Sequence, residues 1–216
     1  MDTTAEFGSL ALIEDGAVVE ELPIHSPEGF GHVLFSRIQE LLGRHALKAR
    51  QIQCFAAGAG PGSFTGVRVG LTAAKGLADA VGVSVVGVSN LRAIASFGTG
   101  AVQATLLDAR RGEVYAAVFG GTVEQPELVS RFPEWLAQLP EQVTEFVAQE
   151  FGPFAAVIGA SRFADRRFVI APRALAGAIG LLAWGEFIEG RAQDPAAVDA
   201  NYVRRSDAEL LWKELP

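Results

Sequence analysis

The sequence predicts an α/β protein made of two similarly built lobes. Apolar runs of strand length alternate with longer segments in which apolar residues recur at helical spacing. Half of the 216 residues are hydrophobic and a fifth are charged, a composition that can bury a core. The order of strands, helix and strand occurs twice along the chain, which favours two layered units of the same class.

Residues 1–100 are predicted to form the N-terminal lobe. Asp15-Gly16 lies between two apolar runs and predicts a hairpin, because the turn needs residues that tolerate positive φ. Apolar residues at helical spacing over 32–44 predict an amphipathic helix. The other elements expected here are buried strands at 52–57 and 84–88, a helix from an N-cap at Ser63 to about Ala80, and a short helix at 91–97.

Residues 101–216 are predicted to form the C-terminal lobe, after an inter-domain link at 97–100. A helix at 174–188 is apolar nearly all round, so we expect it to be largely buried. A terminal helix at 207–213 is expected to return to the N-terminal lobe. Strands are expected at 103–107, 114–119, 155–159 and 168–171, whereas 122–150 shows only short helical pieces between prolines.

Charge and cysteine content exclude several classes of protein. The chain carries 18 Lys and Arg against 25 Asp and Glu, a net charge of −7. It therefore lacks the positive field that an autonomous nucleic-acid binder needs. The single cysteine, Cys54, excludes an internal disulfide and a cysteine metal cluster, and we expect it to be a buried structural thiol. No signal peptide or membrane span is visible, so we expect a soluble cytoplasmic protein without a membrane partner.

The glycine-rich segment 58–76 fits neither nucleotide-binding template. It lacks the lysine of a P-loop and the third glycine of a dinucleotide fingerprint. Gly66, Gly70 and Ala74 share one face of the predicted helix, where interior glycine costs about 1 kcal/mol unless a neighbour approaches closely. That neighbour is either the chain's own sheet or a partner helix.

Other catalytic and metal-binding patterns are missing. No Gly-x-Ser-x-Gly elbow occurs, and His25, His32 and His45 lack metal-ligand spacing, so we expect no metal site and no hydrolase. Two acidic turns remain, which could form a vestigial nucleotide site because actin-like ATPases bring such turns to phosphates and Mg²⁺. The alternative is that each aspartate caps the backbone of a structural turn. The residues of this candidate site are Asp2, Thr3, Thr4, Asp108 and Arg110.

Four segments resemble one family closely. Residues 60–70 read GPGSFTGVRVG and continue to Ala78 in the same pattern. Residues 87–91 (GVSNL), 108–115 (DARRGEVY) and 202–205 (YVRR) agree in the same order. Together they resemble the TsaB (YeaZ) family of glycoprotease-like proteins over nearly the whole chain.

The resemblance implies a two-lobed actin-like ATPase (ASKHA) fold, in which each lobe is a mixed sheet with flanking helices. It implies a non-catalytic scaffold or activator subunit that dimerises with TsaD to form threonylcarbamoyladenosine beside the anticodon of tRNAs reading codons that begin with A. The ATPase TsaE joins the complex, ATP and a metal ion belong to the partner subunits, and the isolated chain holds no cofactor. The chain contacts tRNA only through the complex, and alone it could form a homodimer.

The family's dimer surface, carried over to this sequence, lies on the first two helices. It is expected at Val33, Ile38, Leu41, Val67, Gly70, Leu71, Ala74 and Leu77. The alternative function is a stand-alone actin-like ATPase or small-molecule kinase that uses Asp2 and Asp108. A peptidase has no nucleophile–base pair here.

Three positions depart from the family pattern. Family members usually begin with a short apolar strand before the Asp-Thr turn, whereas here Met1 directly precedes Asp2. Either the start lies upstream, or this chain lacks a central strand and has an open slot in its sheet. Phe30 stands where a histidine is common and Asp199 where a proline is common, which puts a ligand role for the first loop in doubt.

Overall fold

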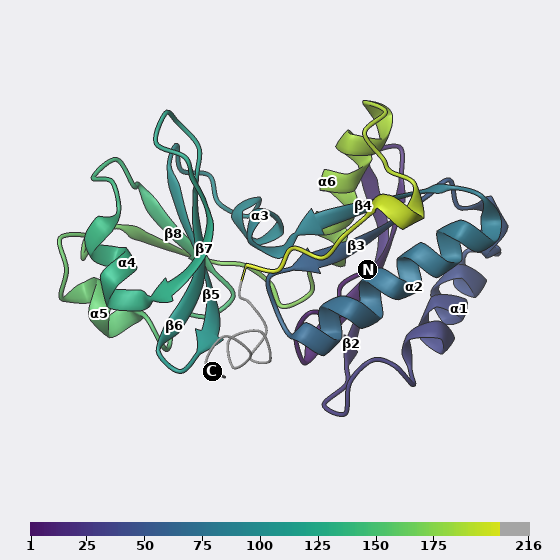
Figure 1. The fold of residues 1–216 in the computed structure, drawn as a ribbon, viewed down its shortest axis with the longest axis horizontal. Helices are drawn as coiled ribbons and strands as arrows, with labels where there is room; N and C mark the ends of the chain where they lie inside the picture. Colours follow the sequence, from purple (N-terminus) through teal and green to yellow (C-terminus); the bar gives the residue numbers. More distant parts are fainter. Residues whose placement is uncertain (204–216) are drawn as a thin grey trace, which may run out of the picture.

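The computed structural model describes residues 1–203, which fold into two lobes of strands and helices (Figure 1). The first lobe, on the right in Figure 1, is built mainly from the first half of the chain. Its elements are β1 (Phe7–Glu14), β2 (Ala17–His25), α1 (Leu34–Arg44), a 3-10 turn (Ala49–Gln51), β3 (Cys54–Gly60), α2 (Phe64–Val81), β4 (Ser84–Ser89) and α3 (Asn90–Ala95).

Local chemistry places these elements close to where the sequence predicts them. Asp15 and Gly16 have φ of 49° and 74°, so the hairpin turns at the predicted dipeptide. The Ser63 hydroxyl accepts a hydrogen bond from the Gly66 N–H at 3.3 Å and caps α2 as predicted. Gly82, left-handed at φ 74°, ends the helix.

The strands of the first lobe form two separate pairs. β1 pairs antiparallel with β2, and β3 pairs parallel with β4 after the crossover helix α2. Of residues 1–203, only Met1 and Asp2 lie between the two pairs and bond to both. The Met1 amine donates to the Ala56 carbonyl at 2.8 Å, and Asp2 forms an antiparallel bridge with Ser9.

The second lobe contains a five-stranded sheet and two short helices. The elements are β5 (Gln103–Arg110), β6 (Glu113–Phe119), β7 (Gln125–Arg131), α4 (Phe132–Gln138), β8 (Glu145–Ala148), α5 (Ala155–Gly159) and β9 (Arg167–Ile170). The strand order is β7-β6-β5-β8-β9, in which β5, β6 and β7 are antiparallel neighbours and β8 and β9 run parallel to β5.

Two of these strands and one helix differ from the expectation. The sequence predicted neither β7 nor β8. The strand expected at 155–159 was wrong, because this short apolar run forms the helix α5, which buries only Ile158.

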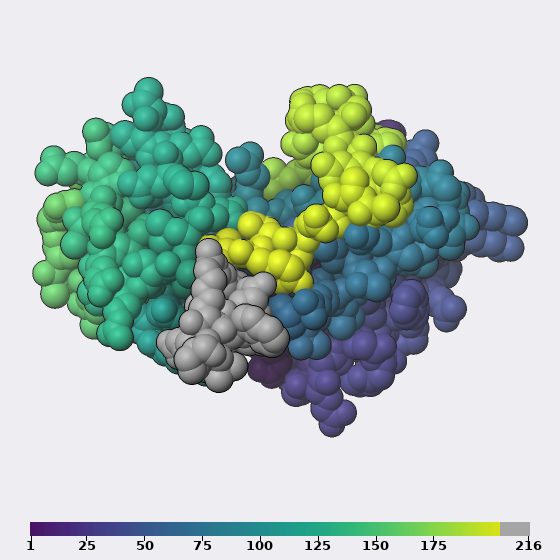
Figure 2. Space-filling model, viewed as in Figure 1, coloured from purple at the N-terminus to yellow at the C-terminus, as the bar shows by residue number. Residues whose placement is uncertain are grey.

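The chain returns to the first lobe through α6 (Ala176–Ile188). This helix packs against β1, β2, β3 and β4, which corrects the assignment of all of 101–216 to the second lobe. It is also less buried than predicted, since Leu181 is 41% and Ile188 62% exposed. Residues 191–203, yellow in Figure 2, include a 3-10 turn (Pro195–Ala197) and run across the surface beside α2. The terminal helix expected at 207–213 lies outside the described residues.

The link between the lobes is held by a buried carboxylate. Residues 97–102 connect α3 to β5, where the sequence predicted an inter-domain link. Glu145, 2% exposed, accepts hydrogen bonds from the Thr99 and Gly100 N–H groups, both at 2.7 Å. These two backbone donors fix the path of the link, and the Arg167 guanidinium lies 3.8 Å from the other carboxylate oxygen.

The glycine face of α2 packs within the chain. The Thr3 hydroxyl donates to the Gly66 carbonyl at 2.7 Å. A Cβ placed on Gly66 or Gly70 would lie less than 3.0 Å from Thr3 atoms, closer than real Cβ contacts. Of the two interpretations of the glycine stripe, packing within the chain is therefore favoured at Gly66 and Gly70, although the neighbour is the Thr3 turn rather than the sheet.

We predict that Gly70→Ala lowers the free energy of unfolding by about 1–3 kcal/mol, because the new methyl group overpacks the contact with Thr3. Gly76→Ala on the same helix is the matched control. Nothing lies within 4 Å of its added Cβ, so it should stabilise by up to about 1 kcal/mol. Denaturant unfolding measures both; equal effects of the two substitutions would contradict the close contact.

We also predict that the chain is more stable at pH 8 than at pH 6. Burial lowers the pKa of the Met1 amine from 8.0 to about 6, against the opposing charges of Asp2 and Glu21. In this window the unfolded amine binds a proton that the folded amine does not, so the free energy of unfolding rises with pH. The limit is about 3 kcal/mol, at about 1.4 kcal/mol per pKa unit. Acetylating Met1 removes the titrating group, and the same difference in acetylated protein would refute this cause.

Candidate functional site

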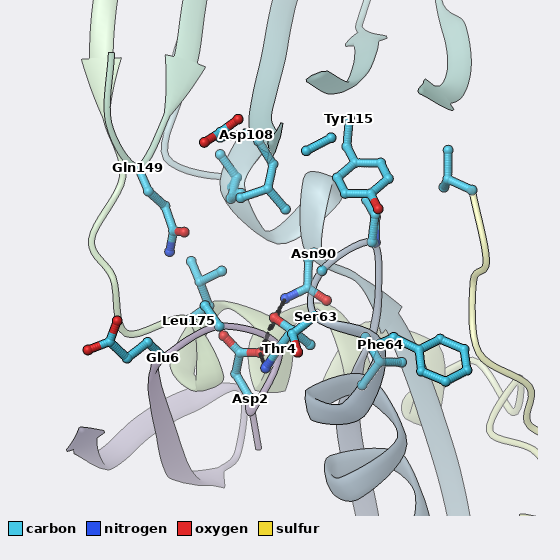
Figure 3. A pocket seen from close by; sticks show the side chains of 18 of the residues that line it. Asp2, Thr4, Glu6, Ser63, Phe64, Asn90, Asp108, Tyr115, Gln149 and Leu175 are labelled. Carbon is cyan, nitrogen blue, oxygen red and sulfur yellow. Dashed lines mark hydrogen bonds between the residues drawn. The ribbon is translucent and has the colours of Figure 1, made fainter. Parts of the chain in front are cut away.

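A cleft of about 1120 Å³ separates the two lobes. Figure 3 shows side chains from both lobes converging on it. Asp2, Thr4 and Asn90 come from the first lobe, while Asp108 and Tyr115 come from the second. Its lining is mixed in charge, with the carboxylates of Asp2, Glu6, Asp108 and Glu150 and the guanidinium groups of Arg68, Arg110 and Arg173.

One oxygen of Asp2 accepts hydrogen bonds from its neighbours at the floor of the cleft. Its Oδ1 accepts hydrogen bonds from the Thr4 N–H at 3.0 Å, the Thr4 hydroxyl at 2.7 Å and the Asn90 Nδ2 at 3.3 Å. Burial raises the pKa of Asp2, and these donors oppose the rise. The Asp2 carboxylate therefore caps the backbone of a structural turn, which is the alternative that the sequence left open for this motif.

Asn90 is a cleft residue that the sequence analysis did not single out. It is 1% exposed, its Nδ2 donates to the Thr4 hydroxyl at 2.7 Å, and its Oδ1 accepts from the Gly60 N–H at 3.0 Å. It ties the start of α3 to the first turn and to the glycine-rich loop. The only sequence signal was its place in the segment 87–91, because nothing in its spacing indicates these contacts.

Asp108 lies at the opposite wall, on the second lobe. Its Oδ1 accepts from the Arg110 N–H at 2.8 Å, and the Arg110 guanidinium lies 3.5 Å from Oδ2. Arg110 and Arg111 both have positive φ, of 66° and 56°, in the hairpin between β5 and β6. Asp108 thereby caps its own turn while its side chain borders the cleft.

The structure therefore brings four of the five predicted nucleotide-site residues to one cleft. Thr3 is the exception, because its hydroxyl bonds to α2 rather than bordering the cleft. Among residues 1–203, no three His, Cys, Asp or Glu side chains are grouped so as to hold a metal ion. What the arrangement offers a ligand is a cavity of mixed polar and apolar lining, with carboxylates on both facing walls.

An aromatic pair borders the mouth of the cleft. The Arg68 guanidinium lies 3.8 Å from the centre of the Phe64 ring, and its Nε donates to the Tyr202 hydroxyl at 2.9 Å. Phe64 and Tyr202 are 46% and 50% exposed. This contact joins the beginning of α2 to the end of the described chain, which the sequence did not predict.

The residues predicted as a partner surface lie mostly inside the first lobe. Val33 and Leu77 are partly buried, and the other six are buried. The prediction of these six as a contact surface was therefore wrong, because their faces form the lobe's own core. The six are Ile38, Leu41, Val67, Gly70, Leu71 and Ala74.

The opposite faces of α1 and α2 are exposed. The two helices lie side by side in Figure 1 and share one apolar cluster. Phe35 on α1 is 55% exposed, although it is a large apolar residue. On α2, Thr72 and Gly76 are exposed, and nothing lies within 4 Å of a Cβ built on Gly76. The outer faces of the two helices thus carry an exposed aromatic side chain and, on α2, small side chains with open space around Gly76.

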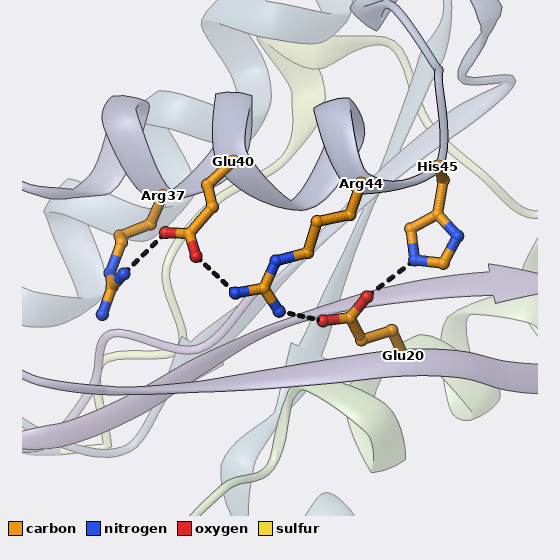
Figure 4. Close-up of polar contacts among 5 residues, drawn as sticks. All are labelled: Glu20, Arg37, Glu40, Arg44 and His45. Carbon is orange, nitrogen blue, oxygen red and sulfur yellow. Dashed lines mark hydrogen bonds and ion pairs between the residues drawn. The ribbon is translucent and has the colours of Figure 1, made fainter.

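A chain of ion pairs holds α1 on the hairpin (Figure 4). Arg44 bridges Glu40, one turn before it, and Glu20 on β2, with both N–O distances 2.5 Å. His45 contacts the other oxygen of Glu20 at 2.7 Å, and Arg37 contacts Glu40 at 2.6 Å. The hydrogen bond from His45, followed by that from Arg44, lowers the pKa of Glu20. The hydrogen bond from Arg37 lowers the pKa of Glu40. The network sets the helix's position relative to β2.

Two further predictions concern the cysteine and membrane-spanning segments. Cys54 is half-buried, and burial raises the pKa of its thiol to about 11, so it is an unreactive thiol at neutral pH. Within residues 1–203, no helix is both long enough and apolar enough to cross a bilayer.

Comparisons with known proteins find one family. A family model described as TsaD, tRNA N6-adenosine threonylcarbamoyltransferase, matches residues 27–154. The tRNA threonylcarbamoyladenosine biosynthesis protein TsaB of Haemophilus influenzae is 31% identical over 235 residues, covering 100% of this chain and 95% of that protein. Its namesake in Escherichia coli is 37% identical over 123 residues, covering 55% of this chain and 53% of that protein.

Solved structures agree on the fold. YeaZ from Pseudomonas aeruginosa superposes with a TM-score of 0.75 at 23% identity, covering 93% of this chain and 96% of that one. A second structure from the same organism, described as similar to the peptidase YeaZ, gives a TM-score of 0.75 at 21% identity over 94% and 97%. With a full-length relative above 30% identity, this chain belongs to the TsaB (YeaZ) family.

Proposed function

We propose that this protein is a scaffold or activator subunit in the formation of threonylcarbamoyladenosine on tRNA. The observation that carries the proposal is its full-length similarity to the Haemophilus TsaB protein, which is named for that biosynthesis. In this role it dimerises with TsaD, and the ATPase TsaE joins the pair. The modified adenosine lies beside the anticodon of tRNAs that read codons beginning with A.

Two features support a role without chemistry of its own. One oxygen of Asp2, Oδ1, accepts hydrogen bonds from Thr4 and Asn90, and Oδ1 of Asp108 accepts one from its own turn. We propose that ATP and the metal ion belong to the partner subunits and that this chain binds neither. Its net charge of −7 fits contact with tRNA through the complex only, in the cytoplasm.

The outer faces of α1 and α2 are the surface we propose for TsaD. They combine an exposed aromatic, Phe35, with small residues on α2 around Gly76. A helix pair from a partner can approach such a face, and the fixed position of α1 on β2 lowers the entropy cost of binding. The same face is available to a second copy of the chain when TsaD is absent. The two-lobed actin-like fold of the family fits this use.

An omission assay tests the proposal. Threonylcarbamoyladenosine on tRNA is followed with TsaD, TsaE and the remaining substrates present, with this chain added or left out. Product that depends on the added chain is the expected result. Equal product without it would show that the chain is dispensable and would refute the subunit role.

For the surface, we predict that Phe35→Asp and Gly76→Arg each weaken TsaD binding at least about tenfold, because they add a charge or bulk to the contact. Both positions are exposed, so the melting temperature of each variant should change by less than about 2 °C. Val157→Asp on α5, an exposed apolar residue of the other lobe, is the matched control. If titration calorimetry shows unchanged TsaD binding in both variants, the interface lies elsewhere on the chain.

A stand-alone ATPase or small-molecule kinase is the alternative, favoured by one observation: Asp2 and Asp108 face the same cleft. It predicts Mg-ATP turnover by the purified chain that Asp108→Ala abolishes. Asp165→Ala, at an exposed position outside the cleft, is the control. Turnover no higher than the blank would remove this alternative without affecting the subunit role.

A further inference from the structure

The last described residues of the chain are bonded to both lobes. Residues 198–203, which we call the strap, end the yellow segment that crosses from the first lobe toward the second in Figure 2. The Lys75 Nζ of α2 donates a hydrogen bond to the Val198 carbonyl at 2.7 Å. The Asn201 N–H donates to the Ala59 carbonyl of β3, also at 2.7 Å. These two contacts make the strap a part of the first lobe.

One side chain of the second lobe reaches the strap. Glu127 lies on β7, at the edge of the five-stranded sheet, and is half-buried. Its Oε2 accepts a hydrogen bond from the Asn201 Nδ2 at 2.5 Å. Its Oε1 accepts one from the Ser89 hydroxyl, which also caps α3. The two donors are 74 and 38 residues away in the sequence, so this carboxylate joins three distant segments at one point.

The strap also forms part of the wall of the cleft. Asn201, Tyr202 and Val203 line it together with residues of both lobes. The chain itself crosses between the lobes at 97–102 and again at 171–175. Short crossings of this kind can absorb the backbone rotations of a hinge motion. Because the strap is bonded to the first lobe, such a motion moves the second lobe away from the strap and changes the width of the cleft.

A neighbouring contact between the lobes is weaker in kind. Glu124 lies 3.9 Å from the Arg92 guanidinium of α3, and both side chains are more than half exposed. Exposed ion pairs contribute little, because water screens them and two long side chains must be ordered. Glu127 is better shielded from water, and its carboxylate accepts two short hydrogen bonds. Of these two contacts, the one at Glu127 is therefore suited to hold the lobes in one orientation.

We propose that Glu127 is a clasp that holds the second lobe on the strap and thereby keeps the cleft closed. With both hydrogen bonds made, the two lobes have one relative orientation. When the clasp opens, the second lobe swings about the two chain crossings, while the strap stays on α2 and β3. The cleft then widens on the side of the strap and exposes its floor, where Asp2 and Asn90 lie.

Distances between spin labels, measured by pulsed dipolar resonance on the full chain, test the clasp. The labels are attached through Thr72→Cys on α2 and Val157→Cys on α5, both exposed positions, in a Cys54→Ala background. We expect Glu127→Ala to lengthen or broaden the interlobe distance distribution by at least about 3 Å. Glu124→Ala, which removes the exposed ion pair from the same segment, is the matched control and should leave the distribution unchanged.

A variant on the strap tests the same contact from the other side. Asn201→Ala removes one of the two hydrogen bonds, so we expect a change in the same direction as for Glu127→Ala. The double variant should change no more than Glu127→Ala alone, because both substitutions act on one contact. Labels at Thr72→Cys and Val18→Cys, both on the first lobe, should keep the same distance in every variant.

Three outcomes would overturn the proposal. Unchanged interlobe distances in Glu127→Ala would show that the orientation of the lobes does not depend on the clasp. An equal change in Glu124→Ala would assign the effect to negative charge along this segment. A changed distance within the first lobe would show that Glu127 supports the fold of that lobe instead of its orientation. No readout involves TsaD or tRNA, so the result is independent of the proposed function.

Discussion

The hydrogen bonds of the first four residues hold the first lobe together. Met1 and Asp2 are the only backbone link between the β1–β2 and β3–β4 pairs in the described part of the chain. Thr3 bonds to the Gly66 carbonyl of α2, and the Thr4 carbonyl accepts from the Ser63 N–H at 2.7 Å. Gly66 and Gly70 of α2 let this turn approach the helix closely, which accounts for their spacing on one face.

The same turn decides what the cleft can do. A carboxylate that accepts three hydrogen bonds at one oxygen is held in position and serves the fold. The hydrogen bonds of Asp2 therefore make this part of the cleft wall part of the architecture of the first lobe. Fold and function separate at such sites, because function depends on which side chains remain free.

The helices α1 and α2 show how one pair of elements serves two purposes. Their apolar faces fill the lobe's core, and ion pairs through Arg44 fix α1 to β2. Their outer faces are then presented rigidly, with Phe35 exposed and glycine on the surface of α2. A rigid exposed face loses little conformational entropy on binding, which fits the proposed use of this face as a partner surface.

The sequence by itself determined the hairpin at Asp15-Gly16, the N-cap at Ser63, most elements and the family, because these depend on local backbone chemistry and short motifs. Only the tertiary structure decided which helix faces are buried, where α6 packs, and that 155–159 is helical rather than extended. It also decided that Asn90 joins the Asp2 turn. Those outcomes depend on contacts between residues far apart in the chain, which hydrophobic periodicity and turn propensity do not encode.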